Sequence, residues 1–248
     1  MALPHTVFVA VPDQTGLESH PLDNVIWHAL NARQIQFSQG DDRARRYMAD
    51  VAPFAAIRDF SPASFASLLP LVPRGDRVAM FTVKPVPPTE HFEILVAKTA
   101  HQMIATRVAG PMQRRDVERL DGSSVYEMLK LVAESQPGPF AARTNQLGDY
   151  FGIRVDGQLI AMTGERMKID GFTEISAVCT HPDHRRHGYA HDLVSAVTRA
   201  VLDRGERPFL HVFSSNLPAI ALYECLGCTI RRTMHLTVLA PQSHSGLT

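Results

Sequence analysis

The stretch HPDHRRHGYAH (181–191) connects a run typical of a β-strand, FTEISAVCT (172–180), to a long helical pattern, AHDLVSAVTRAVLDRG (190–205). Apolar residues recur in that pattern at the i, i+3, i+4 and i+7 positions of one helix face. A strand, a short basic loop with Gly188 and a helix therefore follow one another directly. The first backbone N–H groups of a helix lack intrahelical partners and attract anions. The sequence therefore predicts a phosphate-binding loop at this point.

Two other interpretations of this stretch compete with phosphate binding. Its four histidines could bind a metal, but Pro182 and Gly188 interrupt the stretch, so the four rings are not expected to share a helix face. No local cysteine or carboxylate cluster completes a tetrahedral set. The two arginines could contact nucleic acid, but Lys plus Arg balances Asp plus Glu, 25 against 25, whereas nucleic-acid- and membrane-coating proteins are usually basic. We therefore expect no metal site, no nucleic-acid binding and no membrane binding.

Composition and cysteine usage indicate a globular protein of a reducing compartment. The chain has 248 residues, of which 45 % are hydrophobic and 20 % are charged, and such a chain can bury a sizeable core. It has three cysteines, and this small and odd number does not indicate a disulfide framework. The segment MALPHTVFVAVPDQ (1–14) lacks the basic and apolar regions of a signal peptide, and no run approaches the ~20 apolar residues that span a bilayer. We therefore expect a soluble cytoplasmic protein.

The second half of the chain has the clearer secondary-structure pattern. YFGIRV (150–155) and QLIAMTGERMK (158–168) predict a hairpin closed by a type I′ turn at Asp156-Gly157, and Asp170-Gly171 predicts a second such turn into strand 172–180. Further expected elements are a helix over 123–135, the helix opening at about Tyr189, a strand over 209–214, a short helix over 217–226 capped by Asn216, and one or two strands over 228–240. These elements predict a mixed, mostly antiparallel sheet flanked by helices, in the α/β (α+β) class.

The first half predicts a smaller α/β unit that supports the second. Its expected elements are a helix over 23–33 capped by Asp23, strands over 51–60, 77–83 and 91–97, and a helix over 61–69 capped by Ser61. The regular pattern breaks near Ala109-Gly110-Pro111. We therefore expect one domain over 1–110 and a second over 111–248, of which the polar tail 241–248 is expected to be disordered.

Two motifs in the second half resemble one known family. RRHGYA (185–190) fits the R/Q-x-x-G-x-G/A motif of the GNAT superfamily of acyl-CoA-dependent N-acyltransferases. SSNLPAIALYECLGC (214–228) looks like the later N-x-x-A-x-x-L-Y-x-x-L-G segment of that superfamily, and the order of strands and helices between the motifs also matches. The resemblance covers roughly 112–240. It implies the acyl-CoA N-acyltransferase fold, in the branch with an additional, degenerate transferase-like amino-terminal half.

The resemblance also implies roles for individual residues. Backbone amides of the loop would hold the pyrophosphate of acetyl-CoA, and the edge of strand 172–180 would pair with its pantetheine arm, much as an added strand would. The amide of Val178, at a bulge, would hold the thioester oxygen, and Asn216 would reach the pantetheine. The implied cofactor-binding residues are Val178, Cys179, Thr180, Arg185, Arg186, His187, Gly188, Tyr189, Ala190, Asn216 and Tyr223.

The implied reaction is transfer of an acetyl group from acetyl-CoA to a primary amine by direct attack in a ternary complex. Tyr223 would act as the general acid toward the departing thiolate, and Glu174 as the general base, with Glu165 as a competing candidate. An alternative is a non-catalytic acyl-CoA-binding sensor or structural paralogue. The identity of the amine, the acyl-chain preference and the oligomeric state stay open at this point.

Overall fold

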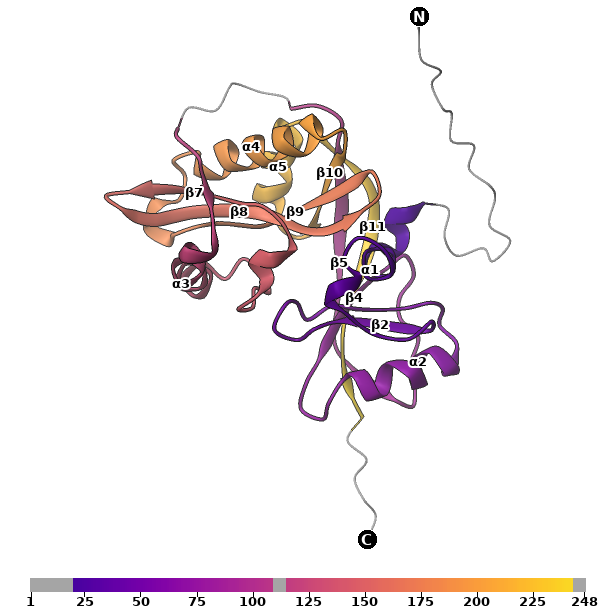
Figure 1. The fold of residues 1–248 in the computed structure, drawn as a ribbon. Coiled ribbons are helices and arrows are strands. Elements are labelled where there is room, and N and C mark those ends of the chain that lie inside the picture. Colours follow the sequence, from indigo (N-terminus) through magenta and orange to yellow (C-terminus); the bar gives the residue numbers. More distant parts are fainter. Residues whose placement is uncertain (1–19, 109–114, 243–248) are drawn as a thin grey trace, which may run out of the picture.

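The computed structural model describes residues 20–108 and 115–242. Its centre is an eight-stranded sheet with the strand order β4-β11-β5-β10-β9-β8-β7-β6, beside a small sheet of order β1-β2-β3 (Figure 1). Neighbours in the large sheet run antiparallel except for the parallel pair β9 and β10. The large sheet comprises β4 (Val78–Thr82), β5 (Phe92–Ala105), β6 (Glu118–Leu120), β7 (Tyr150–Val155), β8 (Gln158–Ile169), β9 (Phe172–Thr180), β10 (Arg207–Phe213) and β11 (Cys228–Pro241). The predicted mixed, mostly antiparallel sheet is therefore confirmed.

In the described part of the chain, five α-helices and the small sheet surround the large one. The helices are α1 (Val25–Asn31), α2 (Pro62–Leu68), α3 (Val125–Ser135), α4 (Tyr189–Asp203) and α5 (Leu217–Cys225), and the small strands are β1 (Ser38–Gly40), β2 (Ala44–Tyr47) and β3 (Ala55–Ile57). Helices α4 and α5 cover one face of the large sheet, and α3 lies on the other side of β7 and β8 (Figure 1). All five predicted helices are present, with ends that differ by a few residues.

The faces of β10 show how the core is divided. Leu210 and Val212 pack with α4 and α5 on one face. Phe209, the neighbour of Leu210 in sequence, packs with α1 and with Phe81 of β4 on the other. Alternation along a strand sends successive side chains to opposite faces, so His211 and Phe213 lie on the same face as Phe209. The two faces are called the α4 face and the α1 face below.

Helix caps follow the prediction at two positions and depart from it at a third. The side chain of Ser61 accepts from the Ser64 N–H at the start of α2, and Asn216 caps α5 in the same way. The predicted cap at Asp23 is wrong, because the buried Asp23 carboxylate accepts hydrogen bonds from Arg231 and Arg232 of β11 instead. A cap prediction uses local sequence only, whereas this carboxylate pairs with arginines of a strand some 200 residues away.

Turn geometry supports one of the two predicted type I′ turns. Asp156 and Gly157 have φ angles of 50° and 78°, as the β7–β8 hairpin requires. At the β8–β9 connection only Gly171, at φ 76°, is left-handed, so this turn reverses the chain as predicted but is not type I′.

The amino-terminal half contributes two strands to the large sheet. Strand β5 lies between β11 and β10, and β4 forms the edge beyond β11. β5 continues to Ala105, beyond the predicted end at 97, because neighbours pair with it on both sides. The predicted division at residue 110 falls within residues 109–114, outside the described chain, and stays a prediction. In the expected disordered tail, Pro241 pairs with Phe92 at the end of β11, while residues 243–248 lie outside the described chain.

Candidate functional site

The large sheet opens between its two parallel strands. β9 and β10 pair only where Phe172–Glu174 lie beside Arg207–Phe209. Beyond these residues the strands separate, so residues 175–180 have no partner in β10, although residues 175, 176, 179 and 180 pair with β8. An unpaired strand edge presents backbone N–H and C=O groups that can pair with an extended ligand.

A bulge interrupts β9 at this opening. The register with β8 passes from Cys179↔Met162 to Ser176↔Gly164, so β9 carries one residue more than its partner over this step. Ala177 lies in the bulge with a φ of 53°, a left-handed conformation that is uncommon for a residue with a side chain. A bulge turns local amides out of the ladder, and the predicted bulge at Val178 coincides with this position.

A cavity of about 870 Å³ extends through the opening. On the α4 face it is bounded by α5 and the loop before α4, and on the α1 face by β4, β5 and β11. Ten of the eleven predicted cofactor-binding residues line it: Val178, Cys179, Thr180, Arg185, Arg186, Gly188, Tyr189, Ala190, Asn216 and Tyr223. The structure therefore brings the two sequence motifs to one cavity, whereas His187 and Glu174 are not part of its lining.

The loop before α4 presents free backbone donors. No group in the described chain accepts a hydrogen bond from the amides of residues 186–190. Arg186 and Gly188 have φ angles of 66° and 84°, and Gly188 is the residue that directly precedes α4. Consecutive free amides at a helix start, next to two arginine side chains, suit a phosphate group.

Arg115 holds this loop from a distant part of the sequence. Its Nη1 donates to Oδ2 of buried Asp192 at 2.8 Å, and its Nη2 donates to the carbonyl of His187 at 2.5 Å. Its guanidinium carbon lies 4.6 Å from the centre of the Tyr189 ring. Sequence analysis missed Arg115, because a residue 77 positions from its partner leaves no local pattern.

Tyr223 projects from α5 into the cavity with 7 % of its surface exposed. Burial raises the pKa of its hydroxyl to about 12, so the phenol carries its proton at neutral pH. No residue of the described chain hydrogen-bonds to this hydroxyl. The group is therefore available as a proton donor to a molecule in the cavity.

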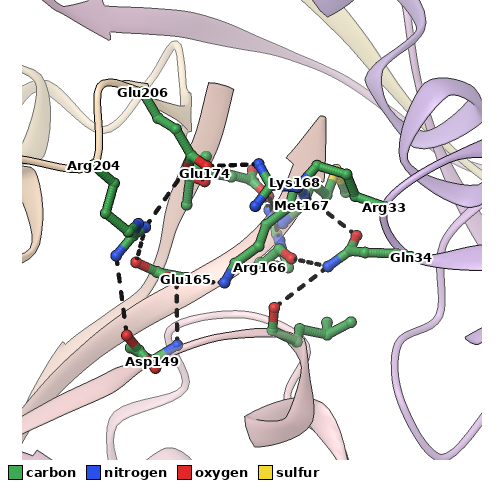
Figure 2. A network of polar contacts seen from close by, with 12 residues as sticks. Arg33, Gln34, Asp149, Glu165, Arg166, Met167, Lys168, Glu174, Arg204 and Glu206 are labelled. Atoms are coloured by element: carbon green, nitrogen blue, oxygen red, sulfur yellow. Dashed lines mark hydrogen bonds and ion pairs between the residues drawn. The ribbon is translucent and has the colours of Figure 1, made fainter. Parts of the chain in front are cut away.

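Glu174 is buried and does not line the cavity, and it belongs to a network of polar contacts (Figure 2). Its two carboxylate oxygens each accept from Arg166 at 2.7 Å, and Oε1 also accepts from His211 Nδ1 at 2.8 Å. Burial alone would raise the pKa of Glu174, but the Arg166 guanidinium and the His211 hydrogen bond outweigh it and lower the pKa to about 2. The carboxylate is thus ionised and fully engaged, which suits a residue that positions its neighbours better than one that accepts a proton from substrate.

The hydrogen bonds around His211 assign its tautomer. The Gln102 amide nitrogen donates to the Leu22 carbonyl at 2.9 Å, and the Gln102 oxygen accepts from Arg231 Nε at 2.5 Å. The amide nitrogen therefore faces His211 Nε2, 3.0 Å away, as a donor. We assign neutral His211 with its proton on Nδ1, directed at Glu174. The sequence offered no signal for His211, which stands in an ordinary strand pattern.

Glu165, the competing base candidate, is engaged in another part of the same polar network (Figure 2). It is buried, accepts from Arg204 Nη2 at 2.5 Å and pairs with Lys168 Nζ at 2.7 Å. It does not line the cavity. Both base candidates therefore lie outside the surface that a substrate would contact.

Comparison with known proteins adds to this geometry. The family model described as FR47-like protein matches residues 150–236. A crystal structure of a protein assigned to the GNAT family of acetyltransferases, from Novosphingobium aromaticivorans DSM 12444, superposes with a TM-score of 0.83 at 35 % identity, over 91 % of this chain and 100 % of that one. The chain belongs to the GNAT family. The resemblance seen in the two motifs is therefore confirmed, and with it the acyl-CoA N-acyltransferase fold.

More distant structures share the fold of this GNAT protein. A GCN5-related N-acetyltransferase from Kribbella flavida matches with a TM-score of 0.57 at 17 % identity, over 88 % of this chain and 97 % of that one. A functionally unknown conserved protein from Staphylococcus epidermidis ATCC 12228 matches with a TM-score of 0.54 at 8 % identity, over 82 % and 93 % of the two chains. No curated protein matches the sequence.

The histidine-rich stretch of the GNAT protein was also considered as a metal site. Within residues 20–108 and 115–242, no group of three or more His, Cys, Asp and Glu side chains could hold a metal ion. His181 instead lies with its ring edge against His184, at 5.6 Å between centroids. No helix in the same residues is long and apolar enough to cross a membrane.

Proposed function

We propose that this GNAT protein is an N-acetyltransferase that moves an acetyl group from acetyl-CoA to a primary amine by direct attack in a ternary complex. The observation that carries the proposal is the unpaired edge of β9, with its bulge at Ala177, in the same cavity as the Tyr223 hydroxyl. A strand edge can bind the extended arm of a thioester, and a protonated phenol can donate its proton to the thiolate that leaves when the thioester is cleaved.

The donor would lie along the cavity from the α4 loop to the opening in the sheet. The free amides of residues 186–190 and the Arg185 and Arg186 side chains are suited to the pyrophosphate. The edge formed by Val178, Cys179 and Thr180 is suited to the pantetheine arm, whose amides need backbone partners. Asn216 lines the same stretch, and its side-chain oxygen also caps α5 by accepting from Ala219 N–H at 3.3 Å.

The proposed chemistry forms one C–N bond and breaks one C–S bond. The neutral amine attacks the thioester carbonyl, whose oxygen would be stabilised by an amide at the bulge, with Val178 as the candidate. Tyr223 then gives its proton to the departing thiolate. The proton that the amine loses leaves through the water of the open cavity, and a proton from that water restores Tyr223. Glu174 stays the sequence-based candidate for the base, but its engaged oxygens support a positioning role, through His211, in the wall of the cavity.

The decisive experiment is a screen of primary amines with acetyl-CoA and purified protein, with release of free CoA as the readout. We expect turnover with at least one amine, and a kcat that falls about 100-fold in Tyr223→Phe while the Kd for acetyl-CoA is kept. An unchanged kcat would remove Tyr223 from the mechanism. Tight acetyl-CoA binding without turnover of any amine would instead favour the sensor.

A further inference from the structure

The amino-terminal half forms one wall of the cavity. On the α1 face, Phe81 of β4, Leu236 of β11 and Lys98 of β5 stand in one cross-strand row. Ala79, Val238 and Val96 form the next row of the same wall. Residues in register on neighbouring strands point to the same face, so these six side chains make a continuous surface. This surface, called the acceptor wall below, lies across the sheet from Tyr223 and α5.

The acceptor wall continues into an aromatic stack. The Phe81 ring lies 4.1 Å from the His211 ring at an interplanar angle of 12°, and 5.9 Å from the Phe54 ring at 27°. His211 offers no free polar atom to a ligand here, because both its ring nitrogens already have hydrogen-bond partners. Phe54 and Phe81 are only 2 % and 6 % exposed, so the stack is a rigid backing for the apolar wall, and that wall suits an apolar or aromatic group.

The charge of the cavity has one sign. Its described lining contains Lys98, Arg166 and the arginines of the α4 loop, and it contains no Asp or Glu. The charge of Arg166 is offset by Glu174, to which it donates twice. Lys98 has no such partner: no carboxylate in the described chain pairs with it, and its Nζ lies 5.2 Å from the centre of the exposed Phe213 ring. One uncompensated cation thus stands at the edge of the apolar wall.

These features discriminate between classes of amine. A polyamine or another substrate with several positive charges would find no carboxylate to pair with its additional ammonium groups. An amine that also carries a carboxylate would find Lys98, and an apolar side chain on it would find the Phe81 stack. The backbones at Lys98 and Phe81 are two strands apart, which is about 10 Å at the usual strand spacing. The flexible lysine side chain can bring its ammonium group closer to the Phe81 ring, to a distance that a single amino acid can bridge.

We infer, on the basis of the proposed N-acetyltransferase activity, that the acceptor is a free amino acid with an apolar or aromatic side chain, and that Lys98 of the amino-terminal half selects it by pairing with the carboxylate. The amino-terminal half is then part of the substrate site as well as a support for it. The amine itself reaches the thioester through the opening between β9 and β10.

The test compares amino acids with amines that lack only the carboxylate. Acetylation of L-phenylalanine and L-leucine is measured beside that of 2-phenylethylamine and isopentylamine, in wild type, Lys98→Glu and Lys84→Glu. Lys84 is exposed just beyond β4 and does not line the cavity, so its variant matches the change in net charge. We expect the wild type to prefer the amino acids. In Lys98→Glu, their kcat/KM should fall roughly five- to tenfold relative to the decarboxylated amines, with acetyl-CoA binding unchanged. Lys84→Glu should keep the wild-type ratio.

Three results would overturn the inference. Equal or better use of the decarboxylated amines by wild type would exclude carboxylate selection while leaving the acetyltransferase proposal standing. An unchanged ratio in Lys98→Glu would remove Lys98 from the site. Absence of transfer to every amine in the panel would instead remove the proposed activity on which the inference rests.

Discussion

Arg166 donates two hydrogen bonds to Glu174, each of 2.7 Å, although both side chains are buried. Arg166 lines the cavity and also belongs to the polar network that joins β8 to the amino-terminal half, where Gln34 donates to the Arg166 carbonyl at 2.6 Å. Removal of one partner from a buried pair leaves the other charge without compensation, which is costly.

The pair predicts how stability changes at low pH. The folded pKa of Glu174 is about 2, below its ordinary value, so the carboxylate contributes stability that is fully present above the ordinary pKa and is lost as the pH falls toward 2. The contribution is about 3 kcal/mol. Urea unfolding at pH 7, 5 and 3 should show this loss in wild type and a weaker dependence in Glu174→Gln, whose free energy of unfolding at pH 7 should be about 3–5 kcal/mol lower. Parallel pH curves for the two proteins would contradict the assignment.

Tyr223 predicts the alkaline side of the rate profile. Its pKa is raised to about 12 by burial, so the acid form persists over the whole range in which amines lose their protons. We expect kcat to rise with pH as the amine deprotonates and to show no decline up to about pH 10. Tyr223→Phe should lower kcat at every pH without changing the shape of the profile. A decline centred near pH 9 in wild type would show that a different acid serves the thiolate.

Arg115 predicts a defect in donor binding rather than in chemistry. Arg115→Ala removes the arginine that pairs with buried Asp192 at 2.8 Å and releases the His187 carbonyl, so the amides of the loop lose their fixed arrangement. We expect the Kd for acetyl-CoA to rise about tenfold, with kcat at saturating acetyl-CoA nearly unchanged. Arg119→Ala is the matched control, because Arg119 pairs with Asp149 at the surface and does not contact the loop. A lower kcat with an unchanged Kd would contradict this role.

The sequence predicted those parts of the site that are carried by local pattern. The α4 loop, the Asn216 cap and Tyr223 each lie within a short motif, and the resemblance of these motifs to one family predicted that they belong to one site. The acceptor wall could not be found in this way: Lys98 meets Leu236 only through strand pairing across 138 residues, and neither position has a distinctive neighbour in sequence. The dependence on contacts between distant residues also explains the wrong cap at Asp23, because Arg231 and Arg232 bind its carboxylate.

Burial explains why Glu174 was difficult to interpret from sequence. Its position in β9 was predicted, but sequence could not indicate which face of the strand would be covered by Arg166 of the neighbouring β8. The structure gives that answer through register, since the β8–β9 pairing shifts between Glu165 and Lys168 and brings Arg166 onto the carboxylate. The candidate base thereby becomes a buried ion-pair partner.

Gly188 allows backbone strain to be separated from donor binding. Its φ is 84°, and a Cβ built on it would lie 3.4 Å from Arg115 Nη1. Gly188→Ala should therefore lower the free energy of unfolding by about 1 kcal/mol and should also raise the Kd for acetyl-CoA, because the strained residue lies among the free amides of the loop. Gly171 in the β8–β9 turn has a similar φ of 76° with nothing within 4 Å of the added Cβ. Gly171→Ala should cost similar stability and leave the Kd unchanged. Equal effects of the two substitutions on the Kd, measured by isothermal titration calorimetry, would mean that the loop amides do not hold the donor.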